Sequence, residues 1–209
     1  MPTICTMSEP SNKTIHSEPS GISTVGCLFI ISAPSGAGKT TLCNAILKKF
    51  PDLCYSISHT TREPRTSEQD GVDYFFITDD EFRHHIEKGS WAEWAKVHGH
   101  YYGTSAQFID RYLSEGKNIL LDIDVNGAKQ ILCRYPLSIT IFIMPPTFET
   151  LKQRLIKRGT DNEQIIAKRL KNAKTEIAQK DQYKHIVVND SLPEAIKTLS
   201  AIISDNQTR

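Results

Sequence analysis

Four runs of apolar residues recur along the chain, at 27–31, 118–123, 138–143 and 185–188. The runs are continuous rather than alternating, which is typical of parallel strands that helices cover on both faces. A helical pattern over 39–49 follows the first run and stops before Pro51, because proline cannot continue a helix. The pattern therefore predicts an α/β fold with a central parallel sheet and helices on both faces.

Two stretches between these strands have a different character. Residues 56–105 are turn-rich, aromatic and polar, with a short strand at 74–77, so we expect an inserted subdomain. Residues 147–180 are basic and helical in pattern, and Thr160 and Glu163 have the spacing of a capping box for a new helix after a break. We expect one domain at 25–204, made of the insert, the basic segment and a core (25–55, 106–146 and 181–204), with flexible tails at 1–24 and 205–209.

Composition and charge narrow the class of protein. The hydrophobic fraction of 39% and the charged fraction of 23% in 209 residues are close to those of ordinary globular proteins. A net charge of +1 gives no general attraction to nucleic acid or to an acidic membrane, and no run approaches the roughly 18 apolar residues of a membrane helix. We therefore expect neither partner, while monomer and homo-oligomer both stay open. The five cysteines form no C-x-x-C pair, which argues against a zinc site or a disulfide framework and favours the cytoplasm.

The segment APSGAGKT, residues 33–40, lies between the first strand and the first helix. A P-loop has Gly, four residues and then Gly-Lys-Ser/Thr in this position, although Ala33 replaces the first glycine here. Lys39 would contact the β- and γ-phosphates of a nucleoside triphosphate, and the Thr40 hydroxyl would bind Mg²⁺. The alternative is a strand-to-helix turn that binds nothing. The expected ATP-binding residues of the loop are Ala33, Pro34, Ser35, Gly36, Ala37, Gly38, Lys39, Thr40 and Thr41.

Two carboxylates come at the end of the second strand, in Leu121-Asp122-Ile123-Asp124. Their spacing of two puts both side chains on one face of a strand, at the edge where ligands gather in open α/β sheets. We expect Asp122 to help Thr40 hold the metal ion. A helix or turn cap is the alternative for an Asp in this position.

The insert carries SHTTREPR at 58–65 and DGVDYFF at 70–76. Two arginines around a proline, with a tyrosine beyond a glycine turn, could hold a second phosphate, because guanidinium groups bind its oxygens bidentately. A solvated turn in which these arginines pair with Glu63 and Glu68 explains the same residues equally well.

Taken together, these motifs resemble the guanylate kinase family of bacterial type. The P-loop, SHTTREPR, DGVDYFF, the run Glu93-Trp94-Ala95 before HYYGT (100–104), LLDIDVNGAK and RLIKRGT fall in the family's order over about 27–201. The resemblance implies a P-loop NTPase fold with an inserted GMP-binding subdomain and a helical lid. It also implies transfer of the γ-phosphoryl group of ATP to GMP, and to dGMP, with Mg²⁺, in purine nucleotide metabolism.

The resemblance assigns roles to individual residues. The GMP phosphate would meet Arg62, Arg65, Tyr74 and Tyr102, and the rest of the GMP site would comprise Ser58, Glu93, Thr104, Asp122 and Asp124. Glu93 is expected to select the base, because guanine presents N1–H and N2–H donors on one edge. Without the resemblance, Glu93 would be interpreted as a surface residue on a helix near Lys96.

By the same resemblance, 147–180 is the lid, and Asn189 contacts the adenine of ATP. The lid arginines would neutralise charge on the transferring phosphoryl group. The alternative for the lid arginines is a solvated charged face. The alternative for Asn189 is an ordinary turn after the last strand. The full catalytic set is expected to be Lys39, Arg62, Arg154, Arg158 and Arg169.

Two other functions compete with this one. The first is a guanylate-kinase-like interaction domain, but such domains typically lose the P-loop lysine and lid arginines that this chain keeps. The second is a sister kinase for another small phosphorylated acceptor, such as a ribose bisphosphate. Ser58 and Glu93 favour guanine over that acceptor.

Overall fold

The computed structural model describes residues 25–207, except 98, 158, 160 and 161. Its main sheet has five parallel strands in the order β2-β7-β1-β8-β9. The strands are β1 (Leu28–Ser32), β2 (Cys54–Tyr55), β7 (Ile119–Asp122), β8 (Ile139–Met144) and β9 (His185–Val188). The central parallel sheet that the apolar runs predict is confirmed, and every run lies within a residue of its strand.

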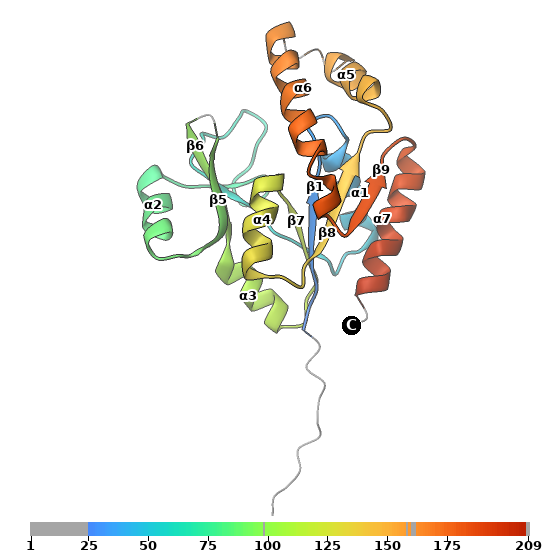
Figure 1. Ribbon diagram of the computed structural model, residues 1–209. Coiled ribbons are helices and arrows are strands. Elements are labelled where there is room, and N and C mark those ends of the chain that lie inside the picture. The colour runs from blue at the N-terminus through green and yellow to red at the C-terminus, as the bar shows by residue number, and fades with distance from the viewer. Residues whose placement is uncertain (1–24, 98, 158, 160–161, 208–209) are drawn as a thin grey trace, which may run out of the picture.

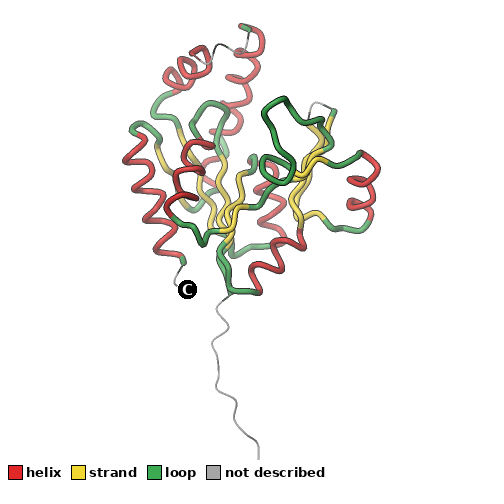
Figure 2. The backbone as a smooth tube through the Cα atoms, turned by 180° about the vertical axis from the view of Figure 1, so that it is seen from behind, coloured by secondary structure: helices red, strands yellow, loops and turns green. Residues whose placement is uncertain are grey.

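Helices cover both faces of this sheet, as predicted (Figures 1 and 2). On one face, α1 (Lys39–Lys49) and α7 (Leu192–Asn206) pack against β1 and β8 through side chains such as Leu42 and Leu199. On the other face, α3 (Ala106–Ser114) and α4 (Val125–Arg134) bury Ile109 and Ile131. The predicted bounds of the first helix match α1, whereas α7 extends two residues into the predicted C-terminal tail.

A second, smaller sheet lies beside the main one and comes from residues 59–105 (Figure 1). Its strand order is β4-β3-β6-β5, with a helix α2 between β4 and β5 in the chain. Phe82 of α2 stacks on Trp91 and Tyr101, so α2 covers one face of this sheet. The bounds are β3 (His59–Thr60), β4 (Phe75–Phe76), α2 (Asp79–Glu87), β5 (Trp91–Val97) and β6 (His100–Ser105).

Two helices, α5 (Phe148–Lys157) and α6 (Glu163–Ile177), stand at the end of the main sheet where its strands finish (Figure 1). Leu151, Leu155 and Ala173 are fully buried between them, and a short 3₁₀ turn, Lys180–Gln182, leads back to β9. The predicted break between two helices is confirmed. The predicted cap is wrong, because Asn162 caps α6 through its side-chain oxygen, which accepts from the Ile165 N–H; Thr160 itself lies outside the described residues.

Within the described ranges, none of the helices is long and apolar enough to cross a membrane.

Candidate active site

The P-loop connects the end of β1 to the start of α1 through two glycines in left-handed backbone. Gly36 and Gly38 both have φ of 92°, a conformation that residues with a Cβ rarely adopt. The Ala37 N–H donates to the Pro34 carbonyl at 3.0 Å, which closes the turn. Lys39 is then the first residue of α1, so the loop presents the positive end of the helix and a lysine at one point.

Lys39 forms an ion pair with Asp122, which ends the neighbouring strand β7. Asp122 lies opposite Ile31 in the parallel register, so both charges come from the carboxyl edge of the sheet. The Thr40 side chain is exposed one residue further along α1. The expected metal-binding pair therefore lies at the same edge as the loop.

The spacing of two residues predicted that Asp122 and Asp124 share one face of a strand. This prediction is wrong. The strand ends at Asp122, and Asp124 is the N-cap of α4, with its Oδ1 accepting from the N–H groups of Asn126 and Gly127 at 2.9 and 2.8 Å. The capping alternative is thus correct for Asp124. Its predicted contact with GMP stays a prediction.

Helices α5 and α6, the predicted lid, each direct one arginine toward the P-loop region. Arg169 of α6 donates to the Ser35 hydroxyl at 3.1 Å, and Arg154 of α5 donates to the Asn189 carbonyl at 2.9 Å. Asn189 is buried and donates from its side-chain amide to the Ala37 carbonyl at 2.8 Å. Gly38 permits this approach, because a Cβ there would lie 2.3 Å from the Asn189 amide nitrogen. Arg158, the third predicted lid arginine, lies outside the described residues.

Glu176 of α6 belongs to this cluster, and the sequence reasoning missed it. Burial raises the pKa of its carboxyl and Asp124 adds to the rise, while Lys39 and a hydrogen bond from the Ser35 backbone oppose it. In the described part of the chain, its Oε2 is buried without a hydrogen-bond partner. Glu176 follows Arg169 by seven residues, two helical turns, so both side chains reach Ser35 from one face of α6. Such a heptad spacing is the only signal in the sequence that could have pointed to it.

Arg62 is held in place on the insert. Its two terminal nitrogens donate to the two oxygens of Glu68, both at 2.9 Å, and its Nε donates to the Tyr102 hydroxyl at 3.2 Å. The ion pair between Arg62 and Glu68 that the solvated-turn alternative expected is therefore present. Arg65 differs, because its side chain is 76% exposed and approaches Glu68 only to 3.9 Å. A carboxylate in the Arg62 fork has the geometry that a phosphate would use.

Tyr74 connects the insert to the P-loop electrostatically. Its ring lies 6.0 Å from the Tyr102 ring and beneath the Arg62 guanidinium. Burial raises the pKa of Tyr74, and the charges of Arg62, Asp122 and Lys39 also act on it. A phosphate bound beside Arg62 would therefore lie close enough to the loop to interact with its charges.

Glu93 is buried, not exposed on a helix. It lies on β5 opposite Thr104 of β6, and the Thr104 hydroxyl donates to Glu93 Oε1 at 2.6 Å. The pKa of Glu93 is raised to about 7, mainly by burial, while the Thr104 hydrogen bond opposes the rise and the charge of Asp124 adds to it. Tyr102 and Thr104 are two residues apart on β6 and share one face, so the carboxylate and the Arg62–Tyr102 pair face the same side. Ser58, half-buried just before β3, accepts from the Phe75 N–H through its carbonyl.

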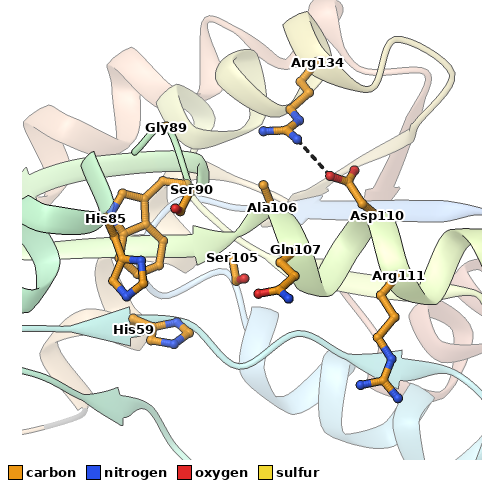
Figure 3. Close-up of a pocket in the computed structure, with 11 residues that line it drawn as sticks. His59, His85, Gly89, Ser90, Ser105, Ala106, Gln107, Asp110, Arg111 and Arg134 are labelled. Atoms are coloured by element: carbon orange, nitrogen blue, oxygen red, sulfur yellow. Dashed lines mark hydrogen bonds and ion pairs between the residues drawn. The ribbon is translucent and has the colours of Figure 1, made fainter. Parts of the chain in front are cut away.

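A cavity of about 410 Å³ lies on the opposite face of the insert sheet, near the start of α3 (Figure 3). His59, Trp91 and Ser105 contribute to its lining, and Arg134 pairs with Asp110 at its edge at 2.8 Å. Burial lowers the pKa of His59 to about 4, which keeps its imidazole neutral. None of the predicted site residues lines this cavity, so the candidate active site is the other face, toward the P-loop.

Comparisons with known proteins point to one family. The family model described as guanylate kinase matches residues 26–206. The guanylate kinase of Thermotoga maritima is 42% identical over 184 residues, covering 88% of this chain and 89% of its own. The guanylate kinase of Syntrophotalea carbinolica is 48% identical over 178 residues, covering 85% of each chain. The crystal structure of guanylate kinase from Anaplasma phagocytophilum matches with a TM-score of 0.72 and 30% identity, covering 90% of this chain and 89% of that one.

Proposed function

This chain belongs to the guanylate kinase family, and we propose that it transfers the γ-phosphoryl group of ATP to GMP, giving ADP and GDP. One observation carries the proposal. A buried carboxylate, Glu93, contacts Thr104, and the Arg62 guanidinium contacts Tyr102 on the same face of the insert sheet, where the charges of Arg62 and Lys39 both act on Tyr74. These are the groups that a guanine base and an acceptor phosphate require.

The donor site consists of the P-loop and the lid. The left-handed glycines and the start of α1 would surround the β-phosphate, and Lys39 would leave Asp122 to contact the β- and γ-phosphates. Arg169 already contacts Ser35 of the loop and Arg154 contacts Asn189 beside it, so movement of the lid would bring both arginines onto the phosphates. Closure of the lid would also exclude water and prevent hydrolysis of ATP. Contact of Asn189 with adenine belongs to this proposal.

The acceptor site consists of the insert. The GMP phosphate would replace Glu68 in the Arg62 fork, with Arg65 free to move onto it and the hydroxyls of Tyr74 and Tyr102 donating. The acceptor oxygen is already anionic near neutral pH, so transfer needs no general base. What the protein supplies is alignment and neutralisation of two anions that would otherwise repel one another.

Mg²⁺ fits the residues at the loop. The Thr40 hydroxyl and the Asp122 carboxylate are hard oxygen donors, and Mg²⁺ is usually bound by one or two protein oxygens together with substrate phosphates and water. When bound, the ion would neutralise charge on the β- and γ-phosphates. In the described residues, no group of three or more His, Cys, Asp or Glu forms a metal site.

We also propose that the protein lies in the cytoplasm, acts in purine nucleotide metabolism and accepts dGMP as well as GMP. The intact Lys39–Asp122 pair argues against an interaction domain that has lost catalysis.

The proposal is tested by measuring ADP release from ATP and Mg²⁺ with GMP, dGMP, AMP, CMP and UMP supplied separately. We expect rapid release with the guanine nucleotides alone, and Glu93→Gln should chiefly lower the preference for them. No release with any acceptor, from folded protein, would overturn the proposal. Release with another phosphorylated acceptor alone would favour the sister-kinase function.

A further inference from the structure

Helix α4 of the core begins directly against Glu93 of the insert. Gly127 is buried in the first turn of α4, and a Cβ added to it would lie 2.9 Å from Glu93 Oε2 and 3.3 Å from its carboxyl carbon. Both distances are shorter than an ordinary van der Waals contact. The carboxylate therefore occupies space that any residue other than glycine would fill.

The same helix holds the backbone of β5 one turn later. The Gln130 side chain accepts from the Trp94 N–H at 3.2 Å and donates to the Trp94 carbonyl at 3.1 Å. Trp94 is the residue after Glu93, and Gln130 follows Gly127 by three residues, so both contacts come from one face of α4. Figure 1 shows α4 beside β5, between the two sheets.

We propose that α4 positions the carboxylate that selects guanine, with Gly127 leaving room for the side chain and Gln130 fixing the strand that carries it. This inference rests on the proposed function and assigns it a specificity-determining residue outside the insert. Glu93 is fixed on its other side by the 2.6 Å bond from Thr104. A methyl group at position 127 must therefore displace the carboxylate, since the Glu93 side chain is the end that can move.

The chemical consequence concerns the two donors of guanine. A carboxylate receives N1–H and N2–H together only when both of its oxygens lie in line with them, and hydrogen bonds weaken steeply as their angles fall. A displaced Glu93 loses part of this pair. Binding of ATP should be unaffected, because α4 makes none of the P-loop contacts described above.

The test is Gly127→Ala, because it should weaken GMP binding without a matching loss of stability. Alanine favours a helix more than glycine does, and this gain opposes the cost of moving Glu93, so the Tm should change little. We expect KM for GMP and the dissociation constant of GMP from calorimetry to rise about tenfold, with KM for ATP unchanged. The preference for GMP over inosine monophosphate, whose base lacks the N2 donors, should fall.

Two further variants keep the test decisive. Gln130→Ala should also weaken GMP binding. It replaces Gly127→Ala as the test if Gly127→Ala does not fold. Lys129→Ala, at an exposed position of the same helix, is the control and should change nothing. Unchanged GMP binding in Gly127→Ala and Gln130→Ala, while Glu93→Gln loses selectivity, would overturn this inference alone. If the unmodified protein shows no GMP-dependent turnover, the proposed function is wrong, and so is this inference.

Discussion

Lys39, the first residue of α1, is ion-paired with Asp122, the last residue of β7. The pair joins the P-loop to the neighbouring strand at the carboxyl edge of the sheet, where each side chain is largely buried. Each charge is neutralised by the other, so the pair fixes the lysine at the loop. An incoming triphosphate has to compete with Asp122 for this lysine.

Replacement of Lys39 tests that arrangement. Lys39→Ala should lower kcat/KM for ATP by at least about 100-fold, because it removes a cation from the transferring phosphates and leaves Asp122 unpaired beside them. Circular dichroism and thermal unfolding should show a folded protein. Lys48→Ala, in the exposed last turn of the same helix, is the matched control. Substantial phosphoryl transfer by Lys39→Ala would refute the role.

Arg62 and Arg65 should differ in importance. Arg62→Lys should raise KM for GMP by about tenfold or more, because a lysine cannot form the two-pronged contact that Glu68 occupies here. KM for ATP should change little. Arg65→Lys should have a smaller effect, since its side chain is exposed and unconstrained by a close contact.

Arg83→Lys, on the exposed side of α2, controls for a general loss of charge. Steady-state kinetics with each substrate varied in turn separates the two sites. Equal effects of the Arg62 and Arg65 substitutions would contradict the preorganised role of Arg62.

Glu93 should make stability depend on pH. Its pKa is raised from an ordinary 4.5 to about 7 in the folded protein, so the unfolded chain ionises first as the pH rises. Glu93 therefore makes its full contribution to the free energy of unfolding below pH 4.5 and loses it as the pH rises through about 7. The total loss is up to ~3 kcal/mol. Glu93→Gln should become more stable relative to the unmodified protein as the pH rises.

Urea unfolding of both proteins at pH 5 and pH 8 measures this difference. All other carboxyl groups are shared, so their titration cancels in the comparison. A difference in stability that does not change between the two pH values would show that Glu93 titrates normally.

Glu176 should act on the donor site. Its carboxylate accepts a hydrogen bond from the Ser35 backbone beside the contact from Arg169, so Glu176→Ala should loosen the P-loop. We expect KM for ATP to rise about fivefold, as loss of one hydrogen bond would predict, with KM for GMP unchanged. Glu176→Gln should largely restore the ATP value, because its amide oxygen can still accept.

Glu163→Gln, at the exposed start of the same helix, is the control for α6. A purely structural role for Glu176 would lower the Tm and affect both substrates alike, and Gln would not rescue it.

Much of the main fold follows from local patterns along the chain. The continuous apolar runs and the glycine loop before Lys39 predict the parallel sheet and the loop, because burial on both faces and left-handed backbone each demand particular residue types. The bounds of β1, β7, β8, β9 and α1 agree with them to within a residue, whereas the short edge strand β2 has no apolar run that predicts it. The capping residue of α6 escaped this reasoning, since Asn162 and Thr160 are both good caps and only the helix start decides between them.

The arrangement of the site was decided by the tertiary structure. The spacing placed Asp122 and Asp124 on one strand face, yet the end of β7 separates them into an ion-pair partner and a helix cap. From the residues around it in the sequence, Glu93 would be interpreted as a surface residue. It is buried because it packs against Thr104, eleven residues away, and against Gly127 of α4. The sequence by itself determined that a loop able to hold a phosphate lies between the first strand and the first helix. Which carboxylates meet which cations depends on long-range packing, because local residue preferences carry no information about contacts between distant segments.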